Sequence, residues 1–302
     1  MLTNLPEEIH WGMTELAHSV AMHAMDNRAN VELEAVEKGE SLDKVHGQAL
    51  RDYEQFNQLI SGAFSFLTKI KHSTGGISID MGSGTGVGAC ILSKFRTINK
   101  VFAVEFSNHF VRNVMPLVFE KYKAECEKIQ RVVSDFNHLE VEKNSIDIIL
   151  DIDSFHHSED LDFTLKECSR VLGSEGVIIA IDRAWPDSCG QDELDAKLDV
   201  DFPDSLKEKY GIPEGKRFTR RDFGEHEYTI QQWFTCFKNN GFEPVLFHLS
   251  HPPTLNRIWL RLPTFEFSMV LSSLLYRLGF RRLWAYGFTK ARVMFVCRKM
   301  TR

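Results

Sequence analysis

The chain has 302 residues, of which 43% are hydrophobic and 26% are charged. This composition excludes a disordered or fibrous protein and predicts a globular fold with a sizeable core. The formal charge of −6 gives no general attraction for phosphate backbones, so nucleic acid is not expected as a partner. The six cysteines form no C-x-x-C pair, and the N-terminus has no basic lead before an apolar run. We therefore expect reduced thiols in a cytoplasmic protein.

Residues 6–67 carry apolar side chains at helical spacing, most clearly over 18–25 and 50–60. We expect an N-terminal helical cap over 1–74 that closes a ligand cleft, with a passive packing layer as the alternative. Aromatic residues in this region are placed to contact a ligand, but on helices they more often belong to the core.

An apolar strand then ends on Asp80 and breaks into three alternating glycines, Gly82, Gly84 and Gly86. Glycines adopt positive φ and let a ligand lie against bare backbone. The helix that follows directs its free N–H groups toward an anionic group. The strand, turn and helix together predict a site for a nucleoside cofactor.

Two cofactor families use such a turn. Residues 84–89 fit the G-x-G-x-x-G/A dinucleotide pattern, with Glu105 about 20 residues on to hold a ribose. Placing Asp80 two residues before Gly82 instead gives D-x-G-x-G-x-G, which resembles motif I of the class I (Rossmann-like) S-adenosylmethionine-dependent methyltransferases of the small-molecule type. The resemblance implies that the acid and the glycines surround the methionine moiety of this cofactor. A pyrophosphate would be repelled by Asp80, so we prefer the methyltransferase interpretation.

Two further strands end on acids, one at Glu105 and one at Asp135. The resemblance implies that Glu105 accepts both ribose hydroxyls, which suit the two oxygens of a carboxylate. It assigns Asp135 to the adenine amino group and Phe136 to the adenine ring. A surface Glu at a strand end and an ordinary turn Asp are the alternatives. The predicted cofactor-binding residues are Asp80, Gly82, Ser83, Gly84, Gly86, Glu105, Phe106, Asp135, Phe136 and Asp151.

A fourth strand over 146–151 is almost continuously apolar, which predicts burial on both faces, and it runs into His156 and His157. A helix over 160–172 leads through a glycine turn to a fifth strand over 177–182. This stretch resembles one that many small-molecule methyltransferases share. The close part of the resemblance extends from the first strand to the fifth.

Methyl transfer to a hydroxyl, an amine or a carbon acid removes a proton, and histidine titrates near neutral pH. His226 is the first candidate for the base, because loops in its position often reach over the acceptor pocket. Glu225 and Glu227 are predicted to share the face opposite His226. His157 and His156 are weaker candidates, since the family usually carries a structural apolar-His pair at that point. An ordinary histidine at a helix entry is the alternative for His226.

The predicted substrate-binding residues are Arg183, Trp185 and Tyr228. Arg183 is placed to clamp an acidic acceptor, unless it simply pairs with Asp187. Trp185 is placed for a cation–π contact with the sulfonium, unless it simply packs. No metal is expected, because no Asn follows Asp182 as it does in the metal-dependent catechol enzymes.

The C-terminal part predicts a helix over 229–240, a strand over 243–249, an insertion over about 252–288 and a closing strand over 291–298. The resemblance implies an α/β fold with a seven-stranded, mostly parallel sheet. The implied strand order is 3-2-1-4-5-7-6, with the last strand antiparallel and helices on both faces. The methyltransferase domain is expected to span 75–302.

Within the insertion, residues 265–278 have an amphipathic pattern whose charge-free stretch is too short to span a bilayer. This segment fits the core, a homodimer interface or a pocket wall. Peripheral contact with a membrane surface or a lipid-linked acceptor stays open as an alternative.

These observations predict methyl transfer from S-adenosyl-L-methionine to a small molecule, with S-adenosyl-L-homocysteine as product. Oxygen is the first choice of acceptor atom, and nitrogen and carbon are alternatives. A protein or RNA acceptor is the second choice, although no Asp/Asn-Pro-Pro-aromatic motif and no Pro-Cys dipeptide occurs. A catalytically silent binding subunit with the same fold is the hypothesis from a different class. The intact Asp80, Gly82, Gly84 and Glu105 argue against silence.

Overall fold

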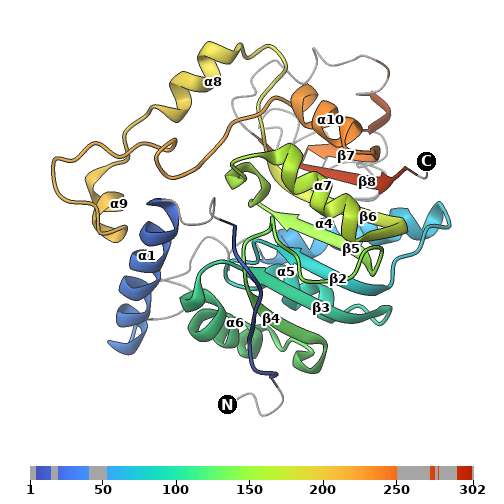
Figure 1. The fold of residues 1–302 in the computed structure, drawn as a ribbon, viewed down its shortest axis with the longest axis horizontal. Coiled ribbons are helices and arrows are strands. Elements are labelled where there is room, and N and C mark those ends of the chain that lie inside the picture. The colour runs from blue at the N-terminus through green and yellow to red at the C-terminus, as the bar shows by residue number, and fades with distance from the viewer. Residues whose placement is uncertain are drawn as a thin grey trace.

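A mixed sheet of eight strands forms the centre of the protein (Figure 1). The computed structural model describes residues 5–14, 20–40, 53–249, 273–275, 278 and 291–300. The strands are β1 (Ile9–His10), β2 (Gly76–Met81), β3 (Ile98–Glu105), β4 (Ile129–Val133), β5 (Ile146–Ile152), β6 (Leu172–Ala184), β7 (Phe242–Leu249) and β8 (Ala291–Lys299). They lie in the order β1-β4-β3-β2-β5-β6-β8-β7. β8 is antiparallel to β6 and β7, and the other pairs are parallel.

The sheet confirms the predicted α/β fold, because β2 to β8 repeat the order 3-2-1-4-5-7-6 with an antiparallel last strand. The number of strands is a correction. Ile9 and His10 pair in parallel with Val132 and Val133 and so add an eighth strand beyond β4. The helical prediction is therefore wrong for residues 6–14. The open edge of β4 offers unpaired backbone groups to this segment, and pairing with them outweighs the helical pattern.

Helices cover both faces of the sheet. They are α1 (Val20–Glu37), α4 (Tyr53–Lys69), α5 (Val87–Ser93), α6 (Met115–Tyr122), α7 (Leu161–Val171), α8 (Gln191–Leu198), α9 (Asp204–Lys209) and α10 (Ile230–Asn239). Short turns of other helix types are η2 (Phe110–Val114), η3 (Cys126–Lys128) and η4 (Phe155–His157). α4, α5 and α6 bury apolar side chains on one face, and α7 and α10 do so on the other.

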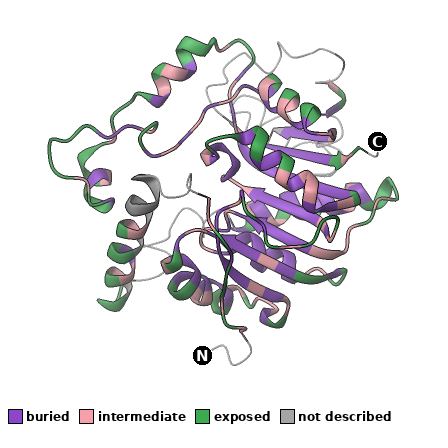
Figure 2. Cartoon of the chain, in the orientation of Figure 1, coloured by how far each residue is buried: buried purple, intermediate pink, exposed green. Residues whose placement is uncertain are grey.

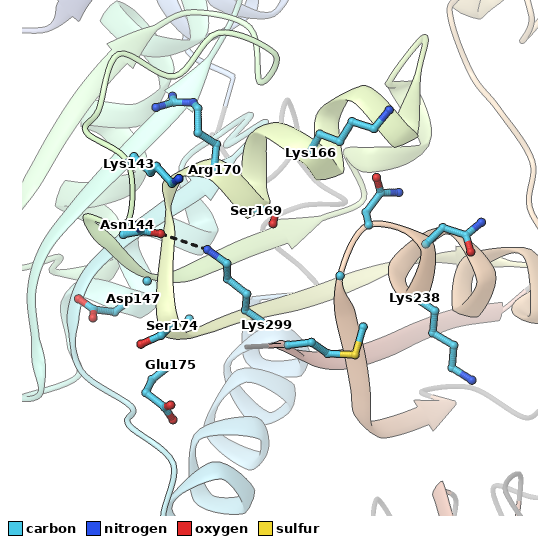
Figure 3. Close-up of a pocket in the computed structure, with 16 residues that line it drawn as sticks. Lys143, Asn144, Asp147, Lys166, Ser169, Arg170, Ser174, Glu175, Lys238 and Lys299 are labelled. Carbon is cyan, nitrogen blue, oxygen red and sulfur yellow. Dashed lines mark hydrogen bonds between the residues drawn. The ribbon is translucent and has the colours of Figure 1, made fainter. Parts of the chain in front are cut away.

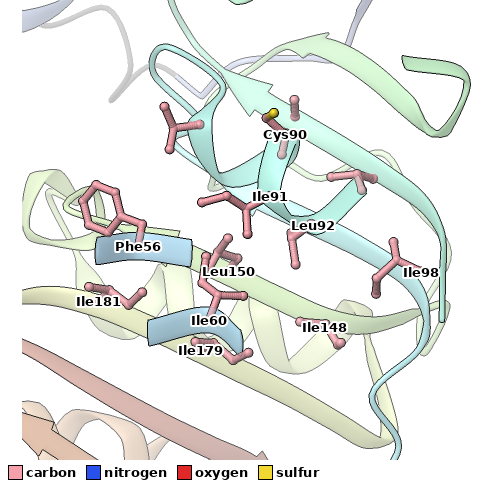
Figure 4. Packing of buried hydrophobic residues seen from close by; sticks show 14 of the residues in the cluster. Phe56, Ile60, Cys90, Ile91, Leu92, Ile98, Ile148, Leu150, Ile179 and Ile181 are labelled. Atoms are coloured by element: carbon pink, nitrogen blue, oxygen red, sulfur yellow. The ribbon is translucent and has the colours of Figure 1, made fainter. Parts of the chain in front are cut away.

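The face under α4 shows why that helix forms. Its buried side chains recur at three- and four-residue spacing, which places one apolar stripe against the sheet. Phe56 and Ile60 lie over Ile179 and Ile181 of β6 (Figure 4). Full burial of a side chain of this size contributes about 1.5–3 kcal/mol. α4, which the sequence predicts as part of the cap, therefore belongs to the main core.

Between β6 and α10 the chain leaves the sheet, and this excursion carries α8 and α9 (Figure 1). Tyr210, Phe218 and Phe223 give the excursion a small core of its own. α1 lies beside α9, and Asn27 Nδ2 donates a hydrogen bond to the Tyr210 carbonyl oxygen at 3.3 Å. The outer surfaces of α8 and α9 are largely exposed (Figure 2). The proposed boundary between residues 74 and 75 stays a prediction.

The insertion at 252–288, with its amphipathic segment at 265–278, lies outside the described residues apart from 273–275 and 278. Of the helices that are described, none combines the length and the apolar character needed to cross a bilayer.

Candidate functional site

The glycine turn connects β2 to α5 at the carboxyl edge of the sheet. Gly82, Gly84 and Gly86 have φ values of 61°, 51° and 85°, which side-chain-bearing residues rarely adopt. A Cβ on Gly82 would lie 2.4 Å from the Cβ of Ser154, so close packing requires this glycine. Among the described residues, a Cβ on Gly84 would meet only the Gly82 carbonyl oxygen, at 4.0 Å. That side of the turn is therefore open to a ligand.

The place of the turn in the sheet is also favourable for binding. β2 has β3 on one side and β5 on the other, so the strand order reverses at this point. In open α/β sheets, ligands bind beyond the carboxyl ends of the strands at such a reversal. The predicted acids at the ends of β2, β3, β4 and β5 all reach this edge.

Asp80 is buried under the turn and braces it. Its Oδ2 accepts hydrogen bonds from the Ser83 hydroxyl and from the Ala89 N–H, the latter at 2.7 Å. A Cβ on Gly88 would lie 2.4 Å from Asp80 Oδ1, so this glycine lets α5 approach the acid. Burial raises the pKa of Asp80 to about 6, although both hydrogen bonds favour the carboxylate. Sequence reasoning did not foresee this bracing role.

Glu105 ties the turn to the end of β3. Its Oε2 accepts the Gly84 N–H at 2.9 Å, and its Oε1 accepts the Ser107 N–H at 3.0 Å. Burial raises the pKa of Glu105 to about 7, against the effect of these two bonds, and the nearby Asp26 adds to the rise. Asp26 belongs to α1 and accepts a hydrogen bond from the Ser107 hydroxyl at 2.8 Å. The first helix of the cap therefore reaches the predicted ribose site.

Asp135 is engaged by the N-terminal segment. Its Oδ2 accepts hydrogen bonds from the Thr14 N–H at 2.7 Å and from the Thr14 hydroxyl at 2.5 Å. Its Oδ1 accepts the Asn137 N–H at 2.8 Å. The half-buried ring of Phe136 lies beside the glycine turn and meets Phe155 edge-on at 6.5 Å. Residues 5–14 thus complete the edge where the adenine is expected.

Asp151, near the end of β5, is fully buried and only half satisfied. Its Oδ1 accepts the Ser154 N–H at 3.1 Å, the Ser154 hydroxyl at 2.5 Å and the Phe155 N–H at 2.8 Å. Its Oδ2 has no hydrogen-bond partner among the described residues. Burial and the nearby Asp182 raise the pKa of Asp151 well above its ordinary value. An orphaned buried carboxyl oxygen indicates a missing polar or cationic partner.

His156 and Asp182 form a buried pair at the ends of β5 and β6. His156 Nδ1 lies 2.6 Å from Asp182 Oδ1, and the His156 N–H donates to Asp182 Oδ2 at 3.0 Å. Asp182 Oδ1 also accepts the Arg183 N–H at 2.6 Å. Burial is the main cause that raises the pKa of Asp182 to about 6. The acid orients the imidazole through a donated Nδ1–H.

The three predicted catalytic histidines lie together. The His226 N–H donates to the His156 carbonyl oxygen at 2.8 Å, and His226 Nδ1 lies 3.3 Å from the same oxygen. The ring of His157 lies 4.2 Å from the ring of His156 and meets Phe223 edge-on at 5.6 Å. Burial, together with His156, lowers the pKa of His157 well below its ordinary value, so this ring is neutral near pH 7.

The predicted substrate-binding residues join a network of ion pairs. Arg183 pairs with Glu225 at 3.0 Å rather than with Asp187. Arg220 pairs with both Glu225 and Glu227, so the two glutamates share one face as predicted. The indole N–H of Trp185 donates to Glu227 at 2.6 Å.

The two aromatic members of the predicted substrate set have partners within the protein. Lys197 lies 4.4 Å above the ring of Trp185, so a lysine occupies the cation–π position considered for the sulfonium. Tyr228 is half-buried and packs on Trp233 with ring centroids 5.1 Å apart. In the described part of the chain, no group of three His, Cys, Asp or Glu side chains is arranged to hold a metal ion.

A separate hollow of about 1300 Å³ lies at the opposite edge of the sheet, near the C-terminal ends of α7 and α10 (Figure 3). It is rich in cations, but Arg170 is paired with Glu167 at 2.7 Å. Lys299 donates to the Leu172 carbonyl oxygen at 2.6 Å and lies 3.2 Å from Asn144 Oδ1. Cations near helix C-termini offset the helix dipoles. This hollow lies far from the glycine turn and does not belong to the site.

Comparison with known proteins agrees with this geometry. Residues 79–180 match the methyltransferase domain family. The sarcosine/dimethylglycine N-methyltransferase of Halorhodospira halochloris is 30% identical over 154 residues, which cover 51% of this chain and 52% of that protein. The sterol 24-C-methyltransferase of Aspergillus fumigatus is 26% identical over 165 residues, covering 55% of this chain and 39% of that protein. The chain thus spans about half the length, or less, of these relatives.

Two solved structures share the fold. A proposed sarcosine dimethylglycine methyltransferase from Galdieria sulphuraria has a TM-score of 0.54 and 18% identity, covering 85% of this chain and 88% of that one. Geranyl diphosphate C-methyltransferase from Streptomyces coelicolor has a TM-score of 0.50 and 16% identity, covering 80% and 76%. The latter structure contains S-adenosyl-L-homocysteine.

The fold and the glycine site define a class I, Rossmann-like methyltransferase domain. Residues 79–180, which match the methyltransferase domain family, contain Asp80, the glycine turn, Glu105 and Asp135, the predicted contacts of S-adenosyl-L-methionine.

Some residues at the site carry no signal in the sequence. Arg292 pairs with Asp153 at 2.5 Å and lies 4.8 Å above the ring of Phe56. Thr14 and Asp26 reach their partners across more than 80 residues of chain. Contacts of this kind depend on tertiary packing, which a local pattern does not record.

Proposed function

We propose that this protein transfers the methyl group of S-adenosyl-L-methionine to a small-molecule acceptor. The observation that carries the proposal is the open glycine turn at the carboxyl end of β2, where the strand order reverses, next to the buried carboxyls of Asp80, Glu105 and Asp151. The unpartnered Asp151 oxygen suits a ligand that brings positive charge to the site. A bare anion such as a pyrophosphate would be a poor match for three buried carboxyls.

The chain's residues fit the cofactor in three parts. Asp80, Asp151 and the backbone of Gly82, Ser83, Gly84 and Gly86 would hold the methionine moiety. Glu105, with Phe106 directly after it, would take the ribose. Asp135 and Phe136 would hold the adenine. When bound, the cofactor supplies an electrophilic methyl group on a sulfonium.

Reaction of the acceptor depends on how the protein positions the acceptor atom and the base. Proximity and orientation account for much of the catalysis of a displacement reaction. We assign the base to His226, with His157 as the second candidate, because both rings lie at the carboxyl edge beside β5 and β6. His156 anchors the backbone of His226 and is itself held by Asp182, so this pair would position the base. Arg183, Trp185 and Tyr228 remain proposed acceptor contacts.

The relatives change which acceptor atom we favour. The sequence alone favours oxygen. The two curated relatives are an N-methyltransferase and a C-methyltransferase. We therefore propose nitrogen, carbon or oxygen as the methylated atom and give oxygen no preference.

Isothermal titration calorimetry tests cofactor binding. The protein is expected to bind S-adenosyl-L-methionine and S-adenosyl-L-homocysteine but not NAD. Gly82→Ala should weaken this binding by more than about tenfold, because its Cβ would displace Ser154 and the turn. Gly190→Ala is the matched control, since Gly190 has a φ of −77° and open space around it. Absence of cofactor binding by the wild type would remove the proposed activity.

Mass spectrometry identifies the acceptor class. Metabolite, protein and RNA fractions are incubated separately with the enzyme and a cofactor that carries a labelled methyl group. Label in the metabolite fraction is the expected result. Label in protein or RNA alone would favour the second-choice acceptors. Cofactor binding with no label in any fraction would favour a silent binding subunit.

A further inference from the structure

Two arginines stand directly opposite each other at the carboxyl edge of the sheet. Arg183 of β6 and Arg292 of β8 are register partners in the antiparallel pair. Side chains at directly opposite positions point to the same face, and like charges placed there repel. The fold therefore places two arginine side chains on the same face of the sheet. They lie at the end of the sheet where the acceptor is expected, Arg183 one strand beyond β5 and Arg292 two strands beyond it.

Each arginine is held in place by groups from other elements. Arg292 pairs with Asp153 at 2.5 Å and lies over the ring of Phe56 on α4. Arg183 pairs with Glu225 at 3.0 Å. Their side chains keep 20% and 22% of their surface exposed. The two groups are therefore oriented but still partly accessible.

The hydrogen bonding around this pair is incomplete. Arg183 Nε is buried and has no hydrogen-bond partner among the described residues. Asp153 Oδ1 is also buried and has no hydrogen-bond partner among the described residues. Asp153 also has a φ of 52°, in the left-handed region that costs energy for a side-chain-bearing residue. The charge of Arg292 is thus neutralised by Asp153, which has a strained backbone and one carboxylate oxygen without a hydrogen-bond partner among the described residues.

We propose that Arg183 and Arg292 bind an anionic group of the methyl acceptor, a carboxylate or a phosphate. This inference rests on the proposed function. Two planar guanidinium groups on one face suit an anion with several oxygens, because each group can donate in a fork. The anion accepts the Arg183 Nε–H and takes the place of the Asp153 carboxylate on Arg292. Asp153 is an internal ion-pair partner of Arg292 while no acceptor is bound.

The probes are inorganic phosphate, pyrophosphate and malonate, titrated calorimetrically into full-length protein loaded with S-adenosyl-L-homocysteine. At least one probe is expected to bind in the millimolar range. The ranking of malonate against the two phosphates distinguishes a carboxylate acceptor from a phosphorylated one. Arg183→Gln and Arg292→Gln should each weaken binding about tenfold, and Arg292→Lys should weaken it less, because it keeps the charge but loses the fork.

Two further variants separate anion binding from a structural role. Arg298→Gln is the matched control, because Arg298 pairs with Glu243 at the far end of β8 and should leave probe affinity unchanged. Asp153→Asn should strengthen probe binding several-fold, since it removes the competing charge. Thermal melting verifies that every variant is folded.

The inference would be overturned if no probe binds to the wild type, or if the Arg183 and Arg292 variants bind as the wild type does. Weaker probe binding by Asp153→Asn would also count against it. If S-adenosyl-L-homocysteine itself does not bind, the proposed function fails, and the same titrations on the unloaded protein then test the arginine pair alone.

Discussion

The most informative residues of this protein are carboxyls that the fold buries next to one another. Asp80, Glu105 and Asp151 have pKa values that burial raises. Burying a charged group is costly unless the group is paired, and Asp151 keeps one oxygen without a partner. The protein thus maintains a site that is electrostatically incomplete, and a cationic cofactor would complete it.

The raised pKa of Glu105 predicts a pH dependence of stability. Between about pH 4.5 and pH 7 the folded state binds more protons than the unfolded state, so the free energy of unfolding falls as pH rises. Below this window both states are protonated and the effect vanishes. Between these two pH values, the free energy of unfolding of the cofactor-free wild type should fall by up to about 3 kcal/mol more than that of Glu105→Gln. Urea unfolding at a series of pH values measures the difference, and parallel curves for the two proteins would contradict the prediction.

His226 leads to a second prediction at this scale. His226→Ala should slow methyl transfer by about 10²-fold or more, because a proton acceptor is lost. It should leave S-adenosyl-L-homocysteine affinity unchanged, since the glycine turn is untouched. Single-turnover kinetics with the acceptor found by mass spectrometry measures the rate. His138→Ala, at an exposed position, is the control. Turnover equal to the wild type would exclude His226 as the base.

At the scale of elements, helix ends place the site residues. Thr229 begins α10 with a capping box, in which the Gln232 N–H donates to the Thr229 side chain and the Gln232 side chain accepts the Thr229 N–H. Gly241, with a φ of 84°, follows the helix. The same stretch bonds to the residue that follows β6, because the Trp185 N–H donates to the Tyr228 carbonyl oxygen at 2.9 Å. The cap of α10 therefore also secures the loop that carries His226.

This arrangement predicts the effect of removing the cap. Thr229→Ala should lower the free energy of unfolding by about 1 kcal/mol, because it removes the side-chain acceptor at the start of α10. Thr235→Ala, on the exposed side of the same helix, should change stability much less. Denaturant unfolding compares the two variants. Equal losses would show that the capping box contributes nothing beyond helix propensity.

At the scale of the whole molecule, the sheet order decides which residues meet. The reversal between β3 and β5 around β2 brings together acids that are up to about 70 residues apart in the sequence. α1 and the excursion with α9 contact each other through Asn27 and Tyr210, and α1 reaches Glu105 through Asp26 and Ser107. Hydrogen bonds therefore connect α1 both to the excursion with α9 and to the predicted cofactor site at Glu105.

The packing of the whole molecule also predicts its thiol reactivity. Cys90, Cys126, Cys168 and Cys297 are buried, and Cys189 and Cys236 are half-buried. A thiol reagent added to the folded protein should modify at most two cysteines quickly. All six should react in denaturant. Mass spectrometry after brief labelling counts them, and rapid modification of four or more in native buffer would contradict this packing.

The strands, the glycine turn and the acids that follow them were predictable from the sequence, because these depend on alternating burial, on positive φ and on helix capping, which are local properties. The sequence also predicted the cofactor class, since the residues that resemble motif I are closely spaced in the chain. The prediction failed for residues 6–14, where an open sheet edge outweighed a helical pattern.

Which charged groups neutralise one another depends on the three-dimensional packing and could not be predicted from the sequence. This packing turned Asp80 inward to brace the turn, paired Arg183 with Glu225, and placed Arg292 opposite Arg183. It also bound Thr14 to Asp135 across 121 residues. These outcomes depend on distances between elements, and the energy of a charge depends on every neighbour that burial brings close to it.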